Sequence, residues 1–173
     1  MKRFVVLFMG IVFWSSLSCY GQEKDSLLLR HEISVGVGTA SMVDLMAAIG
    51  TSGNYKSSLE IHGQYLYNLN KHVGLGGLLV YEHFGYNKRK GHGELISIMP
   101  TSRFYWFNNE WFAIYSKVGA GLLVDIEDKV YLGFAFNVTP AALEFGWRNF
   151  RVFSEVFPVS PVGILNIGVK YSF

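Results

Sequence analysis

The sequence predicts an all-β protein, an eight-stranded antiparallel up-and-down transmembrane β-barrel. Apolar and polar residues alternate with a period of two almost everywhere after residue 30, which is typical of strands. Aromatic residues make up 16% of the chain, and its 19 glycines far outnumber its 4 prolines, a mixture that suits strands and tight turns better than helices. Short and long connections also alternate along the chain, as they do in membrane barrels.

The alternation divides the chain into eight segments, and roughly 9–11 residues suffice for a tilted strand to cross a membrane. The first, "EISVGVG", places Ile33, Val35 and Val37 on one face, with small or acidic residues on the other. The second and third, "SLEIHGQYLYN" and "HVGLGGLLVYEH", alternate in the same way. The fourth is less regular, and Arg103 sets its facing because a charge avoids lipid.

The remaining segments keep the period of two. The fifth, "FAIYSKVGAGLLV", and the seventh, "FRVFSEV", alternate apolar residues with charged residues and glycines. The sixth needs a one-residue shift, which predicts a bulge around Thr139-Pro140, where proline is tolerated. The eighth, "ILNIGVKYSF", alternates to the last residue. The expected strands are 29–40, 55–68, 72–86, 93–106, 110–124, 130–145, 149–157 and 163–173.

The connections fall into two sets, one at each end of the expected barrel. Residues 69–71, 107–109 and 146–148 form short joints, whereas 41–54, 87–92, 125–129 and 158–162 lie at the opposite end. Outer-membrane barrels have short turns on the periplasmic side and longer loops outside. Aromatic residues gather beside the short joints, where an interfacial girdle is expected: Tyr65, Tyr67, Trp106, Trp111, Trp147, Phe150 and Tyr171.

The first 21 residues have the layout of a secretory signal peptide, with Lys2 and Arg3, an apolar run and then small residues. We expect cleavage after Gly21, which leaves residues 22–173 as the barrel domain. Lipid attachment at Cys19 is the alternative. The expected mature chain has no cysteine, and it is neutral, with 13 basic residues (15 minus Lys2 and Arg3) against 13 acidic ones, which gives no reason to expect nucleic-acid binding.

The charged residues of the polar faces are balanced, four acids against four bases. If the apolar faces contact lipid, these charges lie inside and must pair, because an unpaired buried ion costs several kcal/mol. The interior of an eight-stranded barrel is just wide enough for side chains, so we expect no open pore. The expected lumen charge network comprises Glu60, His62, Glu82, Arg103, Lys117, Glu144, Arg151, Glu155 and Lys170.

The opposite facing gives a different protein class. With the apolar faces inward, the chain would be a soluble lipocalin-like ligand-binding barrel. The polar faces argue against this, because they hold many glycines and few charges for their area.

The stretches "VTPAALEFGWRNFRVFSEV" and "GILNIGVKYSF" resemble the small outer-membrane β-barrel proteins of Gram-negative bacteria, which are OmpX- and OmpA-like in architecture. The resemblance implies an outer-membrane location, and many such proteins have no known activity. It also implies a terminal signal read by the barrel assembly machinery, after passage with periplasmic chaperones. Here that signal would be Leu165, Ile167, Val169, Tyr171 and Phe173.

The sequence offers little evidence of catalysis. Glu60 and His62 point the same way from one strand, but two ligands are too few for a metal site, so we expect no metal and no cofactor. An outer-leaflet lipid A-modifying enzyme is the alternative function, with His83 and Ser97 roughly level in the barrel. Their expected facings differ, and no nucleophile–base–orienter set is complete.

Two loops could contact other molecules. The basic tip formed by Lys88, Arg89 and Lys90 is expected either to contact lipopolysaccharide phosphates or to be simply solvated. The segment 41–54 is apolar for an exposed loop and could cover the barrel mouth or rest on the membrane surface. Otherwise we expect contacts with outer-membrane lipid, and a monomer.

Overall fold

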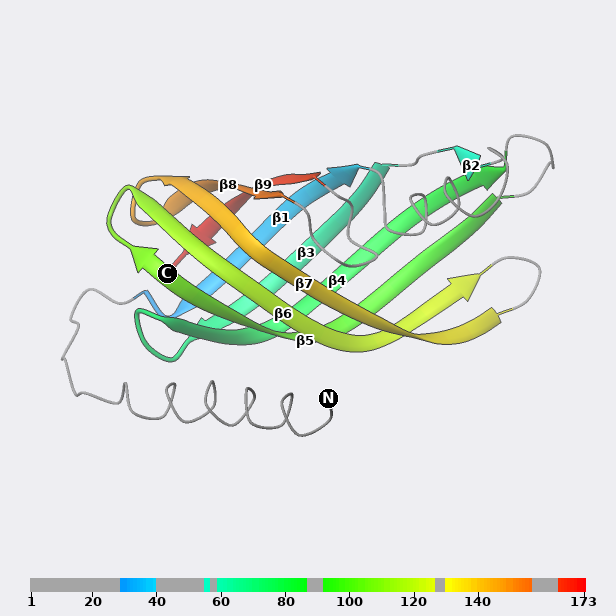
Figure 1. Cartoon of the computed structure of the whole chain (residues 1–173), viewed down its shortest axis with the longest axis horizontal. Coiled ribbons are helices and arrows are strands. Elements are labelled where there is room, and N and C mark those ends of the chain that lie inside the picture. The colour runs from blue at the N-terminus through cyan, green and yellow to red at the C-terminus, as the bar shows by residue number, and fades with distance from the viewer. Residues whose placement is uncertain (1–28, 40–54, 57–58, 87–91, 127–129, 157–164) are drawn as a thin grey trace, which may run out of the picture.

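The described residues form one antiparallel sheet that closes on itself as a barrel (Figure 1). The computed structural model describes residues 29–39, 55–56, 59–86, 92–126, 130–156 and 165–173. Within them no helix is long and apolar enough to cross a bilayer. The strands are β1 (His31–Thr39), β2 (Tyr55–Lys56), β3 (Leu59–Asn68), β4 (Val73–Tyr86), β5 (His92–Asn108), β6 (Phe112–Ile126), β7 (Val130–Gly146), β8 (Phe150–Val156) and β9 (Leu165–Ser172).

Eight long strands build the barrel wall in up-and-down order. Each of β3 to β8 pairs with the long strand that follows it, and β1 pairs with both β3 and β9, which closes the barrel. The two-residue β2 pairs only with the last two residues of β4, Gly85 and Tyr86. The predicted fold class is therefore confirmed, and the expected segment 55–68 corresponds to β2 together with β3.

The predicted bulge in the sixth segment is present in β7. Lys117 pairs with Thr139 and Tyr115 with Ala142, so β7 has one residue more than β6 between these pairs. A second irregularity, which the sequence analysis did not predict, lies in β5 at Trp106. The two bulges are linked on the outer surface, because the Trp106 indole donates to the Ser116 hydroxyl (2.7 Å), which donates to the Pro140 carbonyl oxygen. The chain of hydrogen bonds satisfies polar groups that the bulges leave facing outward.

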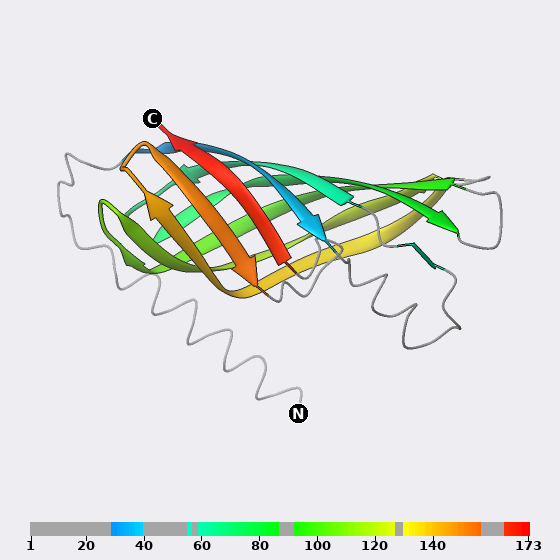
Figure 2. The ribbon, with the colours of Figure 1, turned by 90° about the horizontal axis from the view of Figure 1, so that it is seen from above.

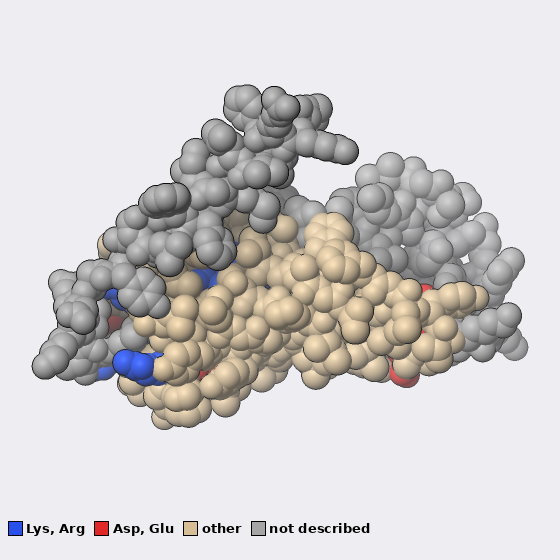
Figure 3. Space-filling view, turned by 90° about the horizontal axis from the view of Figure 1, so that it is seen from below, with Lys and Arg blue, Asp and Glu red and all other residues tan. Residues whose placement is uncertain are grey.

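The barrel is apolar outside and polar inside. Along β9, for example, Val169 is exposed, whereas Lys170 beside it is buried. Figure 3 shows a broad belt without charges on one side of the barrel. A soluble barrel requires the reverse distribution, so this alternative is not the one that the chain adopts. The most exposed apolar side chains include Trp106, Leu122, Val130, Leu132, Phe134 and Trp147.

The wall is taller on one side than on the other. Strands β4 to β7 have 14 to 17 residues, whereas β1, β8 and β9 have 7 to 9. Figures 1 and 2 show the long strands continuing past the ends of the short ones, away from the short turns. Among the described strands, β7 pairs with β8 only from Ala141 to Gly146.

Some inward-facing glycines are required by the close approach of neighbouring strands. A Cβ atom on Gly76 would lie 1.8 Å from the carbonyl oxygen of Tyr65 on β3, and one on Gly121 would lie 2.0 Å from that of Ile98 on β5. No side chain fits at these distances. By contrast, a Cβ atom on Gly77 would meet nothing within 4 Å, because Gly77 faces outward.

We expect Gly76→Ala to lower the free energy of unfolding by about 1–3 kcal/mol, since the strands must move apart to admit a methyl group. The matched control, Gly77→Ala, should be neutral or slightly stabilising, because it only restricts the unfolded chain. Urea titration in lipid vesicles or detergent measures both. Equal stability of the two variants would contradict the close approach of β3 and β4.

We expect Val169→Arg to block assembly, because an arginine on the lipid face near mid-membrane costs roughly 2–4 kcal/mol. Val169→Leu is the control and should assemble normally. The folded fraction is measured by gel mobility of heated and unheated samples. Normal assembly of the arginine variant would mean that the outer face is not in contact with lipid.

Candidate functional site

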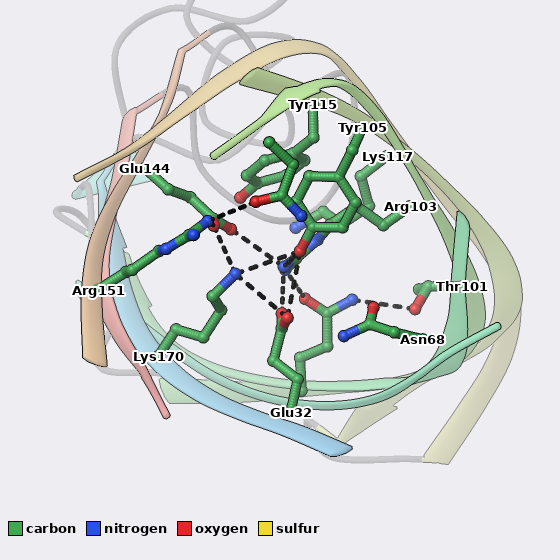
Figure 4. Close-up of polar contacts among 12 residues, drawn as sticks. Glu32, Asn68, Thr101, Arg103, Tyr105, Tyr115, Lys117, Glu144, Arg151 and Lys170 are labelled. Atoms are coloured by element: carbon green, nitrogen blue, oxygen red, sulfur yellow. Dashed lines mark hydrogen bonds and ion pairs between the residues drawn. The ribbon is translucent and has the colours of Figure 1, made fainter. Parts of the chain in front are cut away.

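The polar lumen is the part of the barrel in which charged side chains converge. Its main cluster joins Glu32 of β1, Arg103 and Tyr105 of β5, Glu144 of β7 and Lys170 of β9, all buried (Figure 4). Arg103 donates to Glu32 and lies 3.1 Å from Glu144. Lys170 donates to Glu144 and lies 3.1 Å from Glu32. Two acids therefore alternate with two bases around the Tyr105 hydroxyl, which donates to Glu32 (3.1 Å).

The cluster continues toward the strand turns and along β3. Arg151 lies 3.3 Å from Glu144 and also donates to the Asn108 side chain (2.9 Å) and to the Asn109 carbonyl oxygen. Arg103 donates through Nη2 to Gln64 (2.9 Å), whose amide in turn donates to Thr101 (3.0 Å). Hydrogen bonds to neutral groups thus take up several of the donors that the ion pairs leave over, whereas the Nε atoms of Arg103 and Arg151 have no hydrogen-bond partner among the described residues.

A second cluster lies beside the first. The Lys117 ammonium contacts both carboxylate oxygens of Glu155, at 2.6 and 2.7 Å, and the Tyr115 hydroxyl donates to the same carboxylate at 2.8 Å. The Tyr115 ring also lies 4.3 Å from the Arg103 guanidinium carbon, a cation–π distance. This aromatic ring therefore separates the two clusters while contacting a charged group of each.

Glu60, His62 and Glu82 form the third polar group. His62 Nδ1 lies 3.2 Å from a Glu60 carboxylate oxygen, and Glu60 is the direct cross-strand partner of Glu82. All three side chains are buried. Within the described part of the chain, no group of three or more His, Cys, Asp or Glu residues is arranged to hold a metal ion.

The structure places all nine residues of the expected lumen charge network inside the barrel. It also brings in residues that the sequence analysis left out. Glu32 lies on the polar face of the first strand and is a direct partner of Arg103 and Lys170, so it joins the four acids that the sequence analysis placed in the network. The alternation of Glu32 with Ile33 was the available signal. Tyr105 and Tyr115 share a face with Arg103 and Lys117 in the same alternation, but nothing in the sequence indicated that their hydroxyls would join the ion pairs.

An apolar layer inside the lumen was also missed. Leu78 and Val80 of β4, Met99 of β5 and Ala135 of β7 are buried together, with Leu123 packed against them. Leu78 and Val80 alternate with Leu79 and Tyr81, so the segment "LLVY" carries apolar residues on both faces. A period-two pattern cannot reveal the facing of such a run.

The expected terminal assembly signal forms the outer face of β9. Leu165, Ile167, Val169 and Tyr171 are exposed and alternate with buried residues, and Phe173 is also exposed. The Phe173 ring stacks on His31 at 5.4 Å, and the two residues exchange backbone hydrogen bonds of 2.8 and 3.0 Å. The chain end is thus paired at the seam where β9 meets β1.

Several predictions concern residues outside the described part of the chain. These are the signal peptide of residues 1–21, the loop 41–54, and the basic tip Lys88, Arg89 and Lys90. They remain predictions.

The chain is similar in fold to small barrels of known structure. The N-terminal β-barrel domain of Pseudomonas aeruginosa OprF matches with a TM-score of 0.52 at 16% identity, over 83% of this chain and 98% of that one. The fold is that of a small outer-membrane barrel. The Yersinia pestis outer membrane protein Ail, in a phospholipid bilayer nanodisc, matches with a TM-score of 0.52 at 20% identity, over 84% and 100% of the two chains. No protein-family model and no curated protein matches the chain.

We expect Lys117→Leu to destabilise the barrel by about 3–5 kcal/mol, because it leaves the Glu155 carboxylate buried without its cation. The double variant Lys117→Leu/Glu155→Leu removes both charges and should recover much of the loss. Unfolding in urea measures the single and double variants. A single variant as stable as the native barrel would show that Glu155 does not depend on Lys117.

Proposed function

We propose that the protein is an integral outer-membrane β-barrel of a Gram-negative bacterium, with a structural or surface-interaction role. The observation that carries the proposal is the inverted polarity of the barrel. Its outer face presents rows of Ile, Val, Leu and Phe, whereas Arg103, Lys117 and Glu144 are fully buried inside. Apolar side chains are stable against hydrocarbon. Closure of the barrel also gives every long strand a neighbour on both sides, so the backbone groups of the paired stretches are hydrogen-bonded without water.

The packing of the lumen supports a closed interior without an open pore. Gly36 and Gly168 are cross-strand partners on β1 and β9, and the Phe153 ring lies against both of them. A Cβ atom would lie 2.3 Å from this ring at Gly168, and 2.6 Å from the His62 ring at Gly36. The aromatic rings therefore fill the space that these glycines leave, and the ion pairs fill the next layer.

The proposed partners follow from the two ends of the barrel. Lys88, Arg89 and Lys90 are proposed to contact lipopolysaccharide phosphates. Leu165, Ile167, Val169, Tyr171 and Phe173 are proposed as the signal for the barrel assembly machinery, with periplasmic chaperones acting earlier. We propose a monomer that binds no nucleic acid, in keeping with the neutral charge of residues 22–173.

The described residues favour a protein without catalytic activity over the lipid A-modifying enzyme. Ser97 is buried inside the barrel, whereas His83 is exposed outside. The wall thus separates the hydroxyl from the imidazole that would have to activate it.

Membrane fractionation tests the location. The protein should stay with outer membranes through an alkaline wash and need detergent for release, because its apolar outer face is stable only in lipid or detergent. Recovery as a soluble monomer without detergent would contradict the proposal.

Conductance across planar bilayers tests the closed lumen separately from the location. We expect the inserted protein to give no stable conductance steps. Regular steps would overturn the closed lumen but not the membrane location.

A further inference from the structure

The rim that carries the short turns is basic along one arc. Arg148 lies in the turn between β7 and β8, Arg30 directly precedes β1, and Lys71 lies in the turn between β3 and β4. These positions follow one another around the rim, because β8, β9, β1 and β3 are neighbours in the sheet. The other short turn, between β5 and β6, carries the acidic Glu110. In Figure 3 the prominent Lys and Arg atoms lie at the left end of the molecule.

Aromatic side chains hold the arc at a defined level. Arg30 donates to the Tyr67 hydroxyl at 2.8 Å, and His31 lies 2.8 Å from the Tyr65 hydroxyl through Nδ1. Trp147 immediately precedes Arg148, and its ring lies 5.9 Å from that of Trp111. Tyrosine and tryptophan mark the level of the lipid head groups, where the amphipathic ring has one apolar and one wet end. The cations of the arc therefore lie at the depth of the lipid phosphates.

The adjacent outer surface fits lipid rather than a soluble anion. The exposed apolar face of β8, β9 and β1 begins directly beside the arc, with Phe150, Tyr171 and Ile33. A ligand that contacts both surfaces needs an anionic group joined to acyl chains. A surface cation favours anionic over neutral lipid by about fivefold at low salt, and the preference decreases as salt screens it.

We infer that the arc of Arg30, Lys71 and Arg148 binds the phosphates of anionic glycerophospholipids in the leaflet on the turn side. This inference rests on the proposed function, because it requires that the barrel lies in a bilayer. It differs from the proposed lipopolysaccharide contact in its residues, its leaflet and its ligand. The arc fixes the depth of the short side of the barrel and enriches anionic lipid around it.

The tryptophans of the barrel provide the test. Trp106, Trp111 and Trp147 are exposed near the short turns, and Trp14→Phe in every sample leaves them as the only tryptophans. The chain is reconstituted in brominated phosphatidylcholine, which quenches the tryptophans of an inserted barrel, and unbrominated phosphatidylglycerol is then added. We expect phosphatidylglycerol to displace the brominated lipid about five times better than unbrominated phosphatidylcholine does. This ratio, the lipid preference, should fall toward one in 1 M salt.

Matched variants decide the assignment. Arg30→Gln/Lys71→Gln/Arg148→Gln should lower the preference to about one, whereas the charge-preserving Arg30→Lys/Lys71→Arg/Arg148→Lys should keep it. Lys88→Gln/Arg89→Gln/Lys90→Gln at the other end should also keep it. If the triple glutamine variant does not fold, Lys71→Gln alone should reduce the preference. An unchanged preference in the folded glutamine variants, or displacement of the lipid by inorganic phosphate, would overturn the inference. Tryptophans that brominated lipid never quenches would instead overturn the proposed membrane location.

Discussion

The pairing of charges inside a closed wall is the constraint on which this structure depends. Hydrocarbon on the outside forces the ionic groups in the membrane-spanning part of the wall inward, and the narrow interior of an eight-stranded barrel offers little bulk water. Each ion must then find its counterion on another strand. Arg103 and Glu32 are 71 residues apart in sequence, and Lys117 and Glu155 are 38 apart, yet both pairs are in direct contact. Backbone ladders define which strands are neighbours, and the lumen pairs define which strands face one another.

Such a network adds less stability than its number of contacts suggests. Desolvation of buried ions offsets most of their attraction, whereas loss of one partner leaves a buried charge uncompensated. The network therefore acts mainly against wrong structures. A one-residue slip of β9 would turn Lys170 toward lipid and leave Glu144 without one of its three cations. Glu144 contacts Arg103, Arg151 and Lys170, so its position makes the registers of β5, β8 and β9 depend on one another.

The sequence predicts the strands of the barrel and their facing better than it predicts the side-chain contacts inside the lumen. Strict alternation, as in "ILNIGVKYSF", identifies the strand and its facing because a single charge such as Lys170 fixes the polarity. The bulge at Pro140 was predictable for the same reason, since the alternation changes phase there. The pairing of Glu32 was not, because alternation gives the face of a residue but not the strand opposite. The inward Leu78 and Val80 were missed because apolar runs have no polar face to orient them.

The unequal heights of the wall explain why the lumen has two different halves. The eight residues of β9 extend about 26 Å along the strand and the 17 of β7 about 56 Å, at roughly 3.3 Å per residue. With a tilt of about 40°, these lengths correspond to about 20 Å and 43 Å along the barrel axis, against an apolar band of about 25 Å. Only the half near the short turns is enclosed by all eight strands, and there the ionic clusters find partners on every side. Along the taller wall the inner face carries the apolar layer of Leu78, Val80 and Met99, level with the paired part of β3. Farther toward the loops, the described inner face holds the acids Glu82 of β4 and Asp125 of β6. The larger ionic clusters therefore lie in the half where all eight strands supply partners, and inward charges are sparser along the taller wall.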